Sequence, residues 1–451
     1  MKDRAKLFYT LEIIVYIAII GYLLDIIVLG GGDLTRIFGV STKMIFFAVA
    51  VVLSASMILL DVKKYITNKL LLAVGLFIVV IGINAIRGFV STDNISTAIL
   101  LSDVKGFLNF LMVIPMVYVL NQKERVIRLI KAVTITLSVI AVIVIFLSFY
   151  LKFPQMIQGG IYEFLSENTI CGIARLTRNT IRVFFHTASR LFFGGFLFAL
   201  GLSIVEKNKT PWIVSMILQV IGIVLSFTRS IYLGLFVAAV ALFVVVLRYY
   251  KEEFQIMCRH ICIMCVAVIA SLLLMSVVQG ENVFSVAINR CLLAINTEIP
   301  GEDSTEDTED DTEVQFPGNL EDEQANLSIR EIRTETALKN ISKNPILGSG
   351  LGTINDPNGE LIEYFYLDLL SKIGIVGVLM FLLPAALATL CMWKNWKQYV
   401  REQKLFSILT WTLVLYLLVI SYFNPCMNTT TGLSMYCLLL AVVMPWKSET
   451  K

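Results

Sequence analysis

Twelve apolar stretches divide this sequence, each close to the ~20 residues that a helix needs to cross a bilayer. They lie at residues 8–30, 44–60, 69–86, 98–120, 126–151, 183–205, 211–228, 230–248, 256–279, 364–391, 405–423 and 431–446. Lipid offers the backbone no hydrogen-bond partners, so each stretch must be helical. Of the 451 residues, 57% are hydrophobic, more than a soluble chain of this length could bury. The sequence therefore predicts an all-α, multi-pass membrane protein, a bundle of about twelve transmembrane helices.

Lysine and arginine gather in alternate connections between these stretches. Clusters lie before the first stretch and after the second, fourth, sixth, eighth, tenth and twelfth. Short basic loops face the cytoplasm, so both termini are expected there, and the connections at 152–182 and 280–363 are expected outside. The first stretch is long and no small-residue cleavage site follows it, which predicts a retained helix rather than a cleaved signal peptide.

Three parts follow from this topology. Residues 1–279 hold helices one to nine with the outer loop 152–182, residues 280–363 form a large extracytoplasmic loop before the tenth helix, and residues 364–451 hold helices ten to twelve. Within the large loop, residues 301–323 contain eleven acidic side chains and predict a solvated linker. Residues 324–343 predict an amphipathic helix, and the glycines of 344–352 predict a re-entrant turn.

Arginine is unusually dense in the connections expected outside, against the positive-inside bias. The candidates for binding are Arg182, Arg190, Arg229, Arg330 and Arg333, with Arg175 and Arg178 nearby. A guanidinium group binds phosphate bidentately and stays charged at any relevant pH. These side chains predict a site for a lipid-linked diphosphate. The alternative is that they pair with the acidic linker or with lipid headgroups.

Several titratable residues near the outer ends of the helices are further candidates. Glu363 lies at the mouth of the tenth stretch, either as an interface residue or, if partly desolvated, as a general base. Asp103 and Lys105 are charges near the outer end of the fourth stretch, which makes them functional candidates unless both reach the interface. Asp368 follows Glu363 by five residues and need not share its face, and His186 at a helix start is expected to be structural.

The cysteines suggest neither a metal site nor a settled disulfide. Cys258, Cys262 and Cys265 have a spacing that could bind metal, but they begin an apolar stretch with a single histidine beside them. They are expected to act as small hydrophobic residues, and no metal is predicted. Whether Cys171 and Cys291 pair outside the membrane stays open.

Four short motifs occur in a set order along the chain. They are the turn Ser226-Phe227-Thr228-Arg229-Ser230, the loop arginine Arg333, the run Asn344–Gly352, and Glu363 with Gly374 eleven residues later. This order resembles the O-antigen ligase/polymerase superfamily, integral membrane glycosyltransferases that act on undecaprenyl-diphosphate-linked sugars. The resemblance is best over residues 226–383, and the number of helices and the late outer loop agree along the whole chain.

Some family residues carry over by position. Arg229 matches the arginine of the family's outer turn, although Thr228 stands where serine is usual. Arg333 matches the loop arginine, with Arg330 as the alternative. Glu363 stands where similar ligases carry a histidine, and this departure favours the polysaccharide polymerase branch.

The resemblance implies polymerisation of undecaprenyl-diphosphate-linked repeat units into a surface polysaccharide of capsular or O-antigen type, at the outer face of the bacterial cytoplasmic membrane. Arg229 and Arg333 would hold the diphosphate and neutralise the leaving group, with Arg330, Arg182 and Arg190 as further ligands. Glu363 would take a proton from the acceptor hydroxyl. Neither a metal nor a cofactor is required, because arginine supplies the stabilising charge.

Implied partners are the lipid-linked oligosaccharide, membrane lipid, a flippase and a chain-length regulator, and no nucleic acid. Three alternatives remain: a ligase that passes glycan to an acceptor, a flippase or transporter of lipid-linked oligosaccharide, and a membrane scaffold. Transporters often show duplicated halves and charges near the midplane, whereas this sequence shows no repeat and its charges lie toward the outer face. A scaffold would leave the outer arginines unexplained.

Overall fold

The computed structural model describes residues 2–30, 35–59, 68–90, 95–151, 170–175, 180–249, 320–355 and 364–446, with scattered positions between 160 and 165 and between 255 and 288. Among the described residues, 9 helices are long and apolar enough to cross a membrane. The predicted all-α, multi-pass membrane fold is therefore confirmed. The acidic residues 301–319 and half of the predicted ninth helix, 256–279, lie outside the described residues.

The described helices occupy the other predicted stretches. The spanning candidates are α1 (Lys2–Leu29), α2 (Thr42–Leu59), α4 (Lys69–Val90), α5 (Thr97–Leu108) continued by η1 (Asn109–Met112) and α6 (Val113–Val119), α7 (Lys123–Tyr150), α9 (Ala188–Val205), α11 (Arg229–Tyr249), α15 (Phe365–Asn395) and α16 (Arg401–Ile420). Two shorter apolar helices are α10 (Thr210–Leu225) and α17 (Thr430–Val442). A polar helix, α14 (Leu320–Lys343), follows the undescribed part of the large loop.

Two antiparallel hairpins accompany the helices: β1 (Arg36–Ile37) with β2 (Val40–Ser41), and β3 (Cys171–Arg175) with β4 (Ile181–Phe185). The second hairpin corrects a prediction, because a helix was expected from residue 183 and α9 begins only at Ala188. The segment Ile181–Phe185 is rich in β-branched and aromatic residues. Such residues favour a strand when a partner strand is present, and β3 provides that partner.

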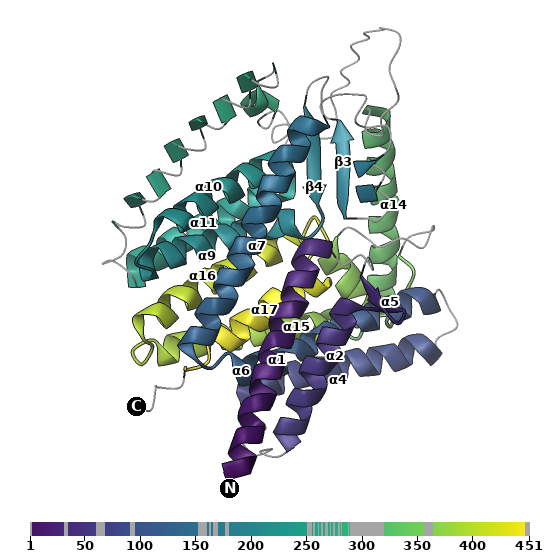
Figure 1. Ribbon diagram of the computed structural model, residues 1–451. Coiled ribbons are helices and arrows are strands. Elements are labelled where there is room, and N and C mark those ends of the chain that lie inside the picture. The colour runs from purple at the N-terminus through teal and green to yellow at the C-terminus, as the bar shows by residue number, and fades with distance from the viewer. Residues whose placement is uncertain are drawn as a thin grey trace.

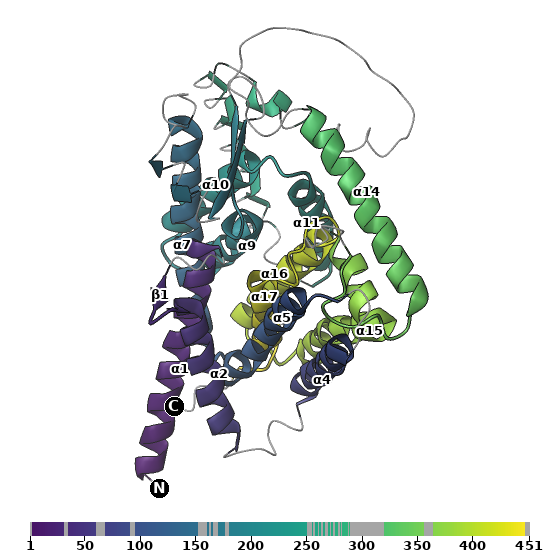
Figure 2. The ribbon, with the colours of Figure 1, turned by 90° about the vertical axis from the view of Figure 1, so that its right-hand side faces the viewer.

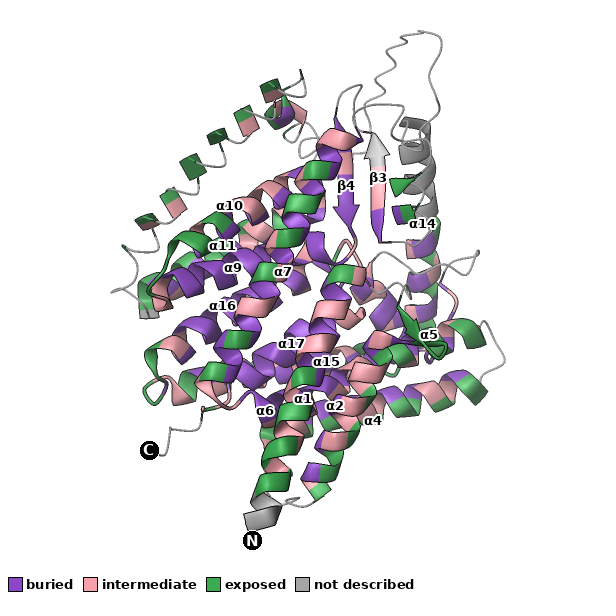
Figure 3. Cartoon of the chain, viewed as in Figure 1, coloured by how far each residue is buried: buried purple, intermediate pink, exposed green. Residues whose placement is uncertain are grey.

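Helices α9, α16 and α17 form the centre of the bundle, and the other helices surround them (Figures 1 and 2). Most residues of these three helices are buried, whereas the outer helices have many exposed residues (Figure 3). Many of the exposed residues are apolar, as expected of lipid-facing surfaces. Helix α14 rises along one side of the molecule and packs against α15 (Figure 2). The central helices are therefore largely enclosed by protein, which suits them to position a site at their ends.

Several helix ends meet at one face of the bundle, the end where Arg182, Arg190 and Arg229 lie, here called the arginine face. The Asn424 side chain donates to the Ser230 hydroxyl over 2.8 Å and joins the α16–α17 connection to the start of α11. The hydroxyls of Thr431 and Thr187, 3.4 Å apart, join the starts of α17 and α9. The polar groups of distant segments are thus gathered at one end of the helices.

Helix α15 is broken at Gly374, where φ is 66° and ψ is −173°. A break inside a membrane helix frees backbone groups that need new partners. The loop 345–350 supplies them through four bonds: Ser349 N to Ser371 O (2.8 Å), Gly350 N to Lys372 O (2.9 Å), Ile375 N to Pro345 O (3.0 Å) and Val376 N to Ile346 O (3.1 Å). The glycine-rich loop is therefore part of the backbone structure of α15.

Replacing Gly374 with alanine should destabilise the protein strongly. Its φ is left-handed, and an added Cβ would lie 2.3 Å from the Ile346 carbonyl oxygen. Strain of this kind costs about 1–3 kcal/mol before the clash is counted. Gly82→Ala in α4 is the matched control, because a Cβ there meets nothing within 4 Å. Thermal unfolding in detergent should show a lower Tm for Gly374→Ala alone, and equal Tm values for both variants would contradict this account of the break.

Candidate functional site

Strand β4 presents Arg182 to the turn that precedes α11. Its Nε donates to the Ser226 carbonyl oxygen over 2.9 Å, and its Nη2 donates to the Thr228 hydroxyl over 3.0 Å. Between them Phe227 is buried and has φ of 44°. A non-glycine residue in this region costs about 1–2 kcal/mol and persists only where its surroundings enforce it, often at functional sites. Arg182 is thus engaged in holding the turn.

Arg229 begins α11 directly after this turn and is half-buried. Its neighbour Ser230 receives the hydrogen bond from Asn424, so the α16–α17 connection lies beside it. The start of a helix carries the positive end of its dipole. The guanidinium and the dipole together make this corner of the arginine face strongly positive.

A single aromatic ring joins the other basic groups. The Cζ atoms of Arg182 and Arg190 lie 4.9 and 5.9 Å from the Phe184 ring centroid, within the range of cation–π attraction. The His186 ring meets Phe184 edge-on at 5.8 Å. Burial, and then the charges of Arg190 and Arg182, lower the pKa of His186 below its usual value. His186 is therefore neutral at neutral pH, and the positive charge here comes from the arginines.

Arg190 has a side-chain N–H that can still donate a hydrogen bond. Its Nε is buried and has no hydrogen-bond partner among the residues that the structure describes. A buried donor left unpaired costs about 1–3 kcal/mol. An anionic ligand that accepted this hydrogen bond would recover that free energy.

An apolar groove of about 460 Å³ runs between α9, α10 and α11. Phe193 and Tyr232 line it, each three residues after one of the arginines, Arg190 and Arg229. The lining continues to Val246 near the far end of α11. The groove therefore begins about one helical turn beneath the arginine face and extends along the membrane-spanning part of α11.

The remaining predicted site residues lie on or near α14 and α15. Arg333 is on α14, and its side chain is buried on the same side as Ala337 and Asn340. The side chain of Arg330 and the whole of Glu363 lie outside the described residues, as does Arg178. The structure thus links Arg182 and Arg190 to each other and to the turn before Arg229. Their meeting with Arg333, Arg330 and Glu363 stays a prediction.

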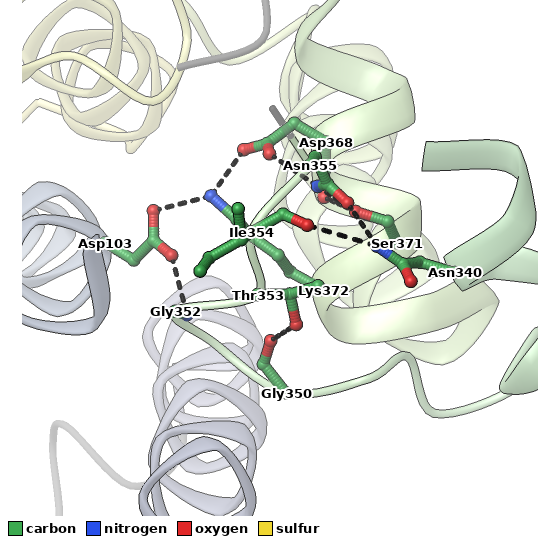
Figure 4. A network of polar contacts seen from close by, with 10 residues as sticks. All are labelled: Asp103, Asn340, Gly350, Gly352, Thr353, Ile354, Asn355, Asp368, Ser371 and Lys372. Carbon is green, nitrogen blue, oxygen red and sulfur yellow. Dashed lines mark hydrogen bonds and ion pairs between the residues drawn. The ribbon is translucent and has the colours of Figure 1, made fainter. Parts of the chain in front are cut away.

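A buried ionic network joins α5 to α15, and sequence reasoning missed its centre (Figure 4). The Lys372 ammonium lies 2.9 Å from Asp103 Oδ1 and 2.8 Å from Asp368 Oδ2. Asp103 was a candidate, but its partner is 269 residues away in the chain. The four-residue spacing of Asp368 and Lys372 in an apolar helix was the signal that could have found the pair. Lys105, the other charge singled out on α5, is exposed.

The network continues from α15 into the large loop and α14 (Figure 4). Asp103 Oδ2 accepts the Gly352 N–H over 3.0 Å. The Asn355 side chain donates to Asp368 over 3.1 Å and accepts from the Asn340 side chain over 2.8 Å. A continuous polar path therefore connects α5, α15, the loop and α14.

Candidate metal ligands and one of the two cysteines considered for a disulfide lie in the described part of the chain. No group of three or more histidine, cysteine, aspartate or glutamate side chains there is placed to hold a metal ion. Cys171 is a free thiol buried in β3, and burial raises its pKa to about 12. Cys291 lies outside the described residues.

Together, the fold and the site define a class: a multi-pass membrane protein whose arginines gather at the ends of its helices, above an apolar groove. Comparison with known proteins gives one family match. The family model described as O-antigen ligase matches residues 214–382, the segment that contains Arg229, Arg333 and the break in α15. The match over these residues confirms the resemblance to the O-antigen ligase/polymerase superfamily. Comparison with curated proteins gave no match.

Proposed function

We propose that the protein polymerises undecaprenyl-diphosphate-linked repeat units into a surface polysaccharide of the capsular or O-antigen type. The observation that carries this proposal is the position of the arginine face at the head of the apolar groove. A polyprenyl-diphosphate donor has the same two parts, a doubly charged anionic head and a long hydrocarbon tail. Guanidinium groups suit the first part, and an apolar groove suits the second.

The reaction needs positively charged groups that bind the diphosphate, and a base. Arg229 and Arg190, with Arg333 from α14, bind the diphosphate and stabilise the charge that develops as it leaves. Arg182 supports the same site by holding the turn before Arg229, and Arg330 is a further ligand. Glu363 takes the proton of the acceptor hydroxyl, whose oxygen bonds to the anomeric carbon as the bond from that carbon to the diphosphate breaks. No metal ion takes part in this scheme.

The same proposal fixes the orientation. The arginine face lies outside the bacterial cytoplasmic membrane, and the basic clusters at the opposite helix ends lie inside, so that both termini are cytoplasmic. A flippase would deliver the donor to this face, and a chain-length regulator would act on the product. Glu363, in place of the histidine of similar ligases, favours polymerisation over transfer to a separate acceptor.

The proposal is tested with purified protein in liposomes. Given a polyprenyl-diphosphate-linked repeat unit, with no nucleotide sugar and with EDTA present, the protein should make a ladder of glycans spaced by one repeat unit. Transfer of glycan to an added acceptor without a ladder would identify a ligase. Movement of intact donor across the vesicle without elongation would identify a flippase.

Filling the groove should weaken binding of the donor's tail. Ala239 lines the groove, whereas the next residue of α11, Val240, is 50% exposed and does not. Ala239→Trp should raise KM about tenfold for a long-tailed donor, which corresponds to about 1.4 kcal/mol of lost apolar burial. KM for a short-tailed donor should be unchanged. Val240→Trp is the matched control, and equal effects of the two variants would remove the groove from the proposal.

A further inference from the structure

We propose that Lys372 is a positioning residue, which acts through Asp103, Asp368, Asn355 and Asn340 to fix the rotation at which α14 presents Arg333. The role of Arg333 as a donor ligand rests on the proposed function. The rotation of α14 itself can be measured independently of any reaction. Lys372 touches neither the donor nor the reacting atoms in this scheme, so its action is indirect.

Lys372 carries the positive charge at the centre of this network. The Lys372 side chain is 3% exposed, and it is the cation that ion-pairs with both carboxylates within the described part of the chain. Two buried carboxylates left without it would repel each other and would need a proton or water. The Gly352 N–H and the Asn355 side chain depend on those carboxylates. Loss of Lys372 would therefore shift Gly352 and Asn355, although the backbone bonds of the loop and the 2.6 Å hydrogen bond from Asn355 to the Ser371 hydroxyl remain.

The loop is hydrogen-bonded to α14 through Asn340. Asn355 accepts a hydrogen bond from the Asn340 side chain, which is buried. The Ser349 hydroxyl donates to the Asn340 backbone carbonyl over 3.4 Å. Asn340 is thus bonded through its side chain and its main chain to the loop that completes α15.

Arg333 and Asn340 lie on the same face of α14. Arg333 precedes Asn340 by seven residues, and Ala337 between them is fully buried. Seven residues make almost two turns of an α-helix, about 10.5 Å along its axis, so the two side chains share one face. On the other side of α14, Leu338 is 51% exposed. A rotation that released Asn340 would move Arg333 by the same angle.

A double-mutant cycle tests the path. Lys372→Met removes the central charge, and Asn340→Ala removes the side-chain hydrogen bond between the loop and α14 without leaving a charge unpaired. Both should lower kcat/KM for the donor at least tenfold, because Arg333 both binds the diphosphate and stabilises the charge that develops on it. Because both act through one path, the double variant should be no worse than Lys372→Met alone. Ser342→Ala, on the exposed last turn of α14, should behave as wild type.

A spectroscopic distance separates positioning from a general loss of structure. Spin labels at Leu338 on α14 and Leu379 on α15, both exposed, are placed in a variant whose native cysteines are replaced and which keeps wild-type polymer length. Asn340→Ala should shift or broaden the label-to-label distance, and Ser342→Ala should not. An unchanged distance in Asn340→Ala, or additive effects on kcat/KM, would overturn the inference. Failure of the wild-type protein to elongate donor would refute the proposed function, while the distances would still decide the role of this path.

Discussion

Arg229→Ala should abolish long polysaccharide while leaving the amount of protein in the membrane unchanged. The side chain is half-buried at the start of α11 and belongs to the positive corner of the arginine face. Removing a group that stabilises developing charge costs about a hundredfold or more in rate, near 2.7 kcal/mol. The fall should appear in kcat/KM measured with purified protein and in the length of polymer made by cells.

Three further variants make this expectation specific. Arg229→Lys keeps the charge but loses the bidentate fork, so it should restore only part of the activity. Arg248→Ala changes an exposed arginine in the last turn of the same helix and should leave elongation intact. Arg333→Ala should reproduce the defect of Arg229→Ala. Polymer of wild-type length from Arg229→Ala would exclude Arg229 from the site.

Glu363→Gln should be the most damaging change to the chemical step. Glutamine keeps the shape of the side chain but cannot accept the acceptor's proton, and loss of a general base lowers kcat about 10²–10⁴-fold. KM should change little, because the donor's contacts remain. The wild-type rate should rise with pH as the carboxyl group ionises, because its basic form is the active one. This rise of the rate with pH should be absent in Glu363→Gln.

A neighbouring carboxylate provides the control for Glu363. Glu360→Gln removes a charge three residues earlier in the chain and should keep both rate and pH profile. Glu363→His, which introduces the residue of similar ligases, should retain part of the activity because histidine is also a base. Unchanged polymer length in Glu363→Gln would remove Glu363 from the mechanism.

The spans were predictable because lipid imposes one rule on every segment. Apolar length alone located α1, α7 and α16 to within a few residues. The rule fails where protein rather than lipid surrounds the backbone. Residues 181–185 have the composition of a membrane stretch, but they pair with Cys171–Arg175 as a strand. Only the presence of a partner strand distinguishes the two outcomes, and local sequence does not contain it.

The arginines were predictable as a group because their density opposes the usual charge bias. Their roles were not. Arg182 binds the turn at 226–228, and the ring that unites Arg182 with Arg190 belongs to Phe184, which no charge pattern singles out. The pairing of Lys372 with Asp103 was missed for a similar reason, because the two lie on helices far apart in the chain, whereas the spacing of Lys372 from Asp368 is local. Single charges can be found from sequence, but pairs between distant helices depend on packing.

The break in α15 bears on how the chain is made. A ribosome delivers residues in order, so the loop 345–350 and Asp103 have already emerged when Gly374 appears. The segment 365–373 is about 14 Å long, too short to cross a bilayer by itself. The four backbone hydrogen bonds at the break all join α15 to the loop 345–350, which is synthesised earlier. This interrupted span can therefore be closed as it enters the membrane, without waiting for the last two helices.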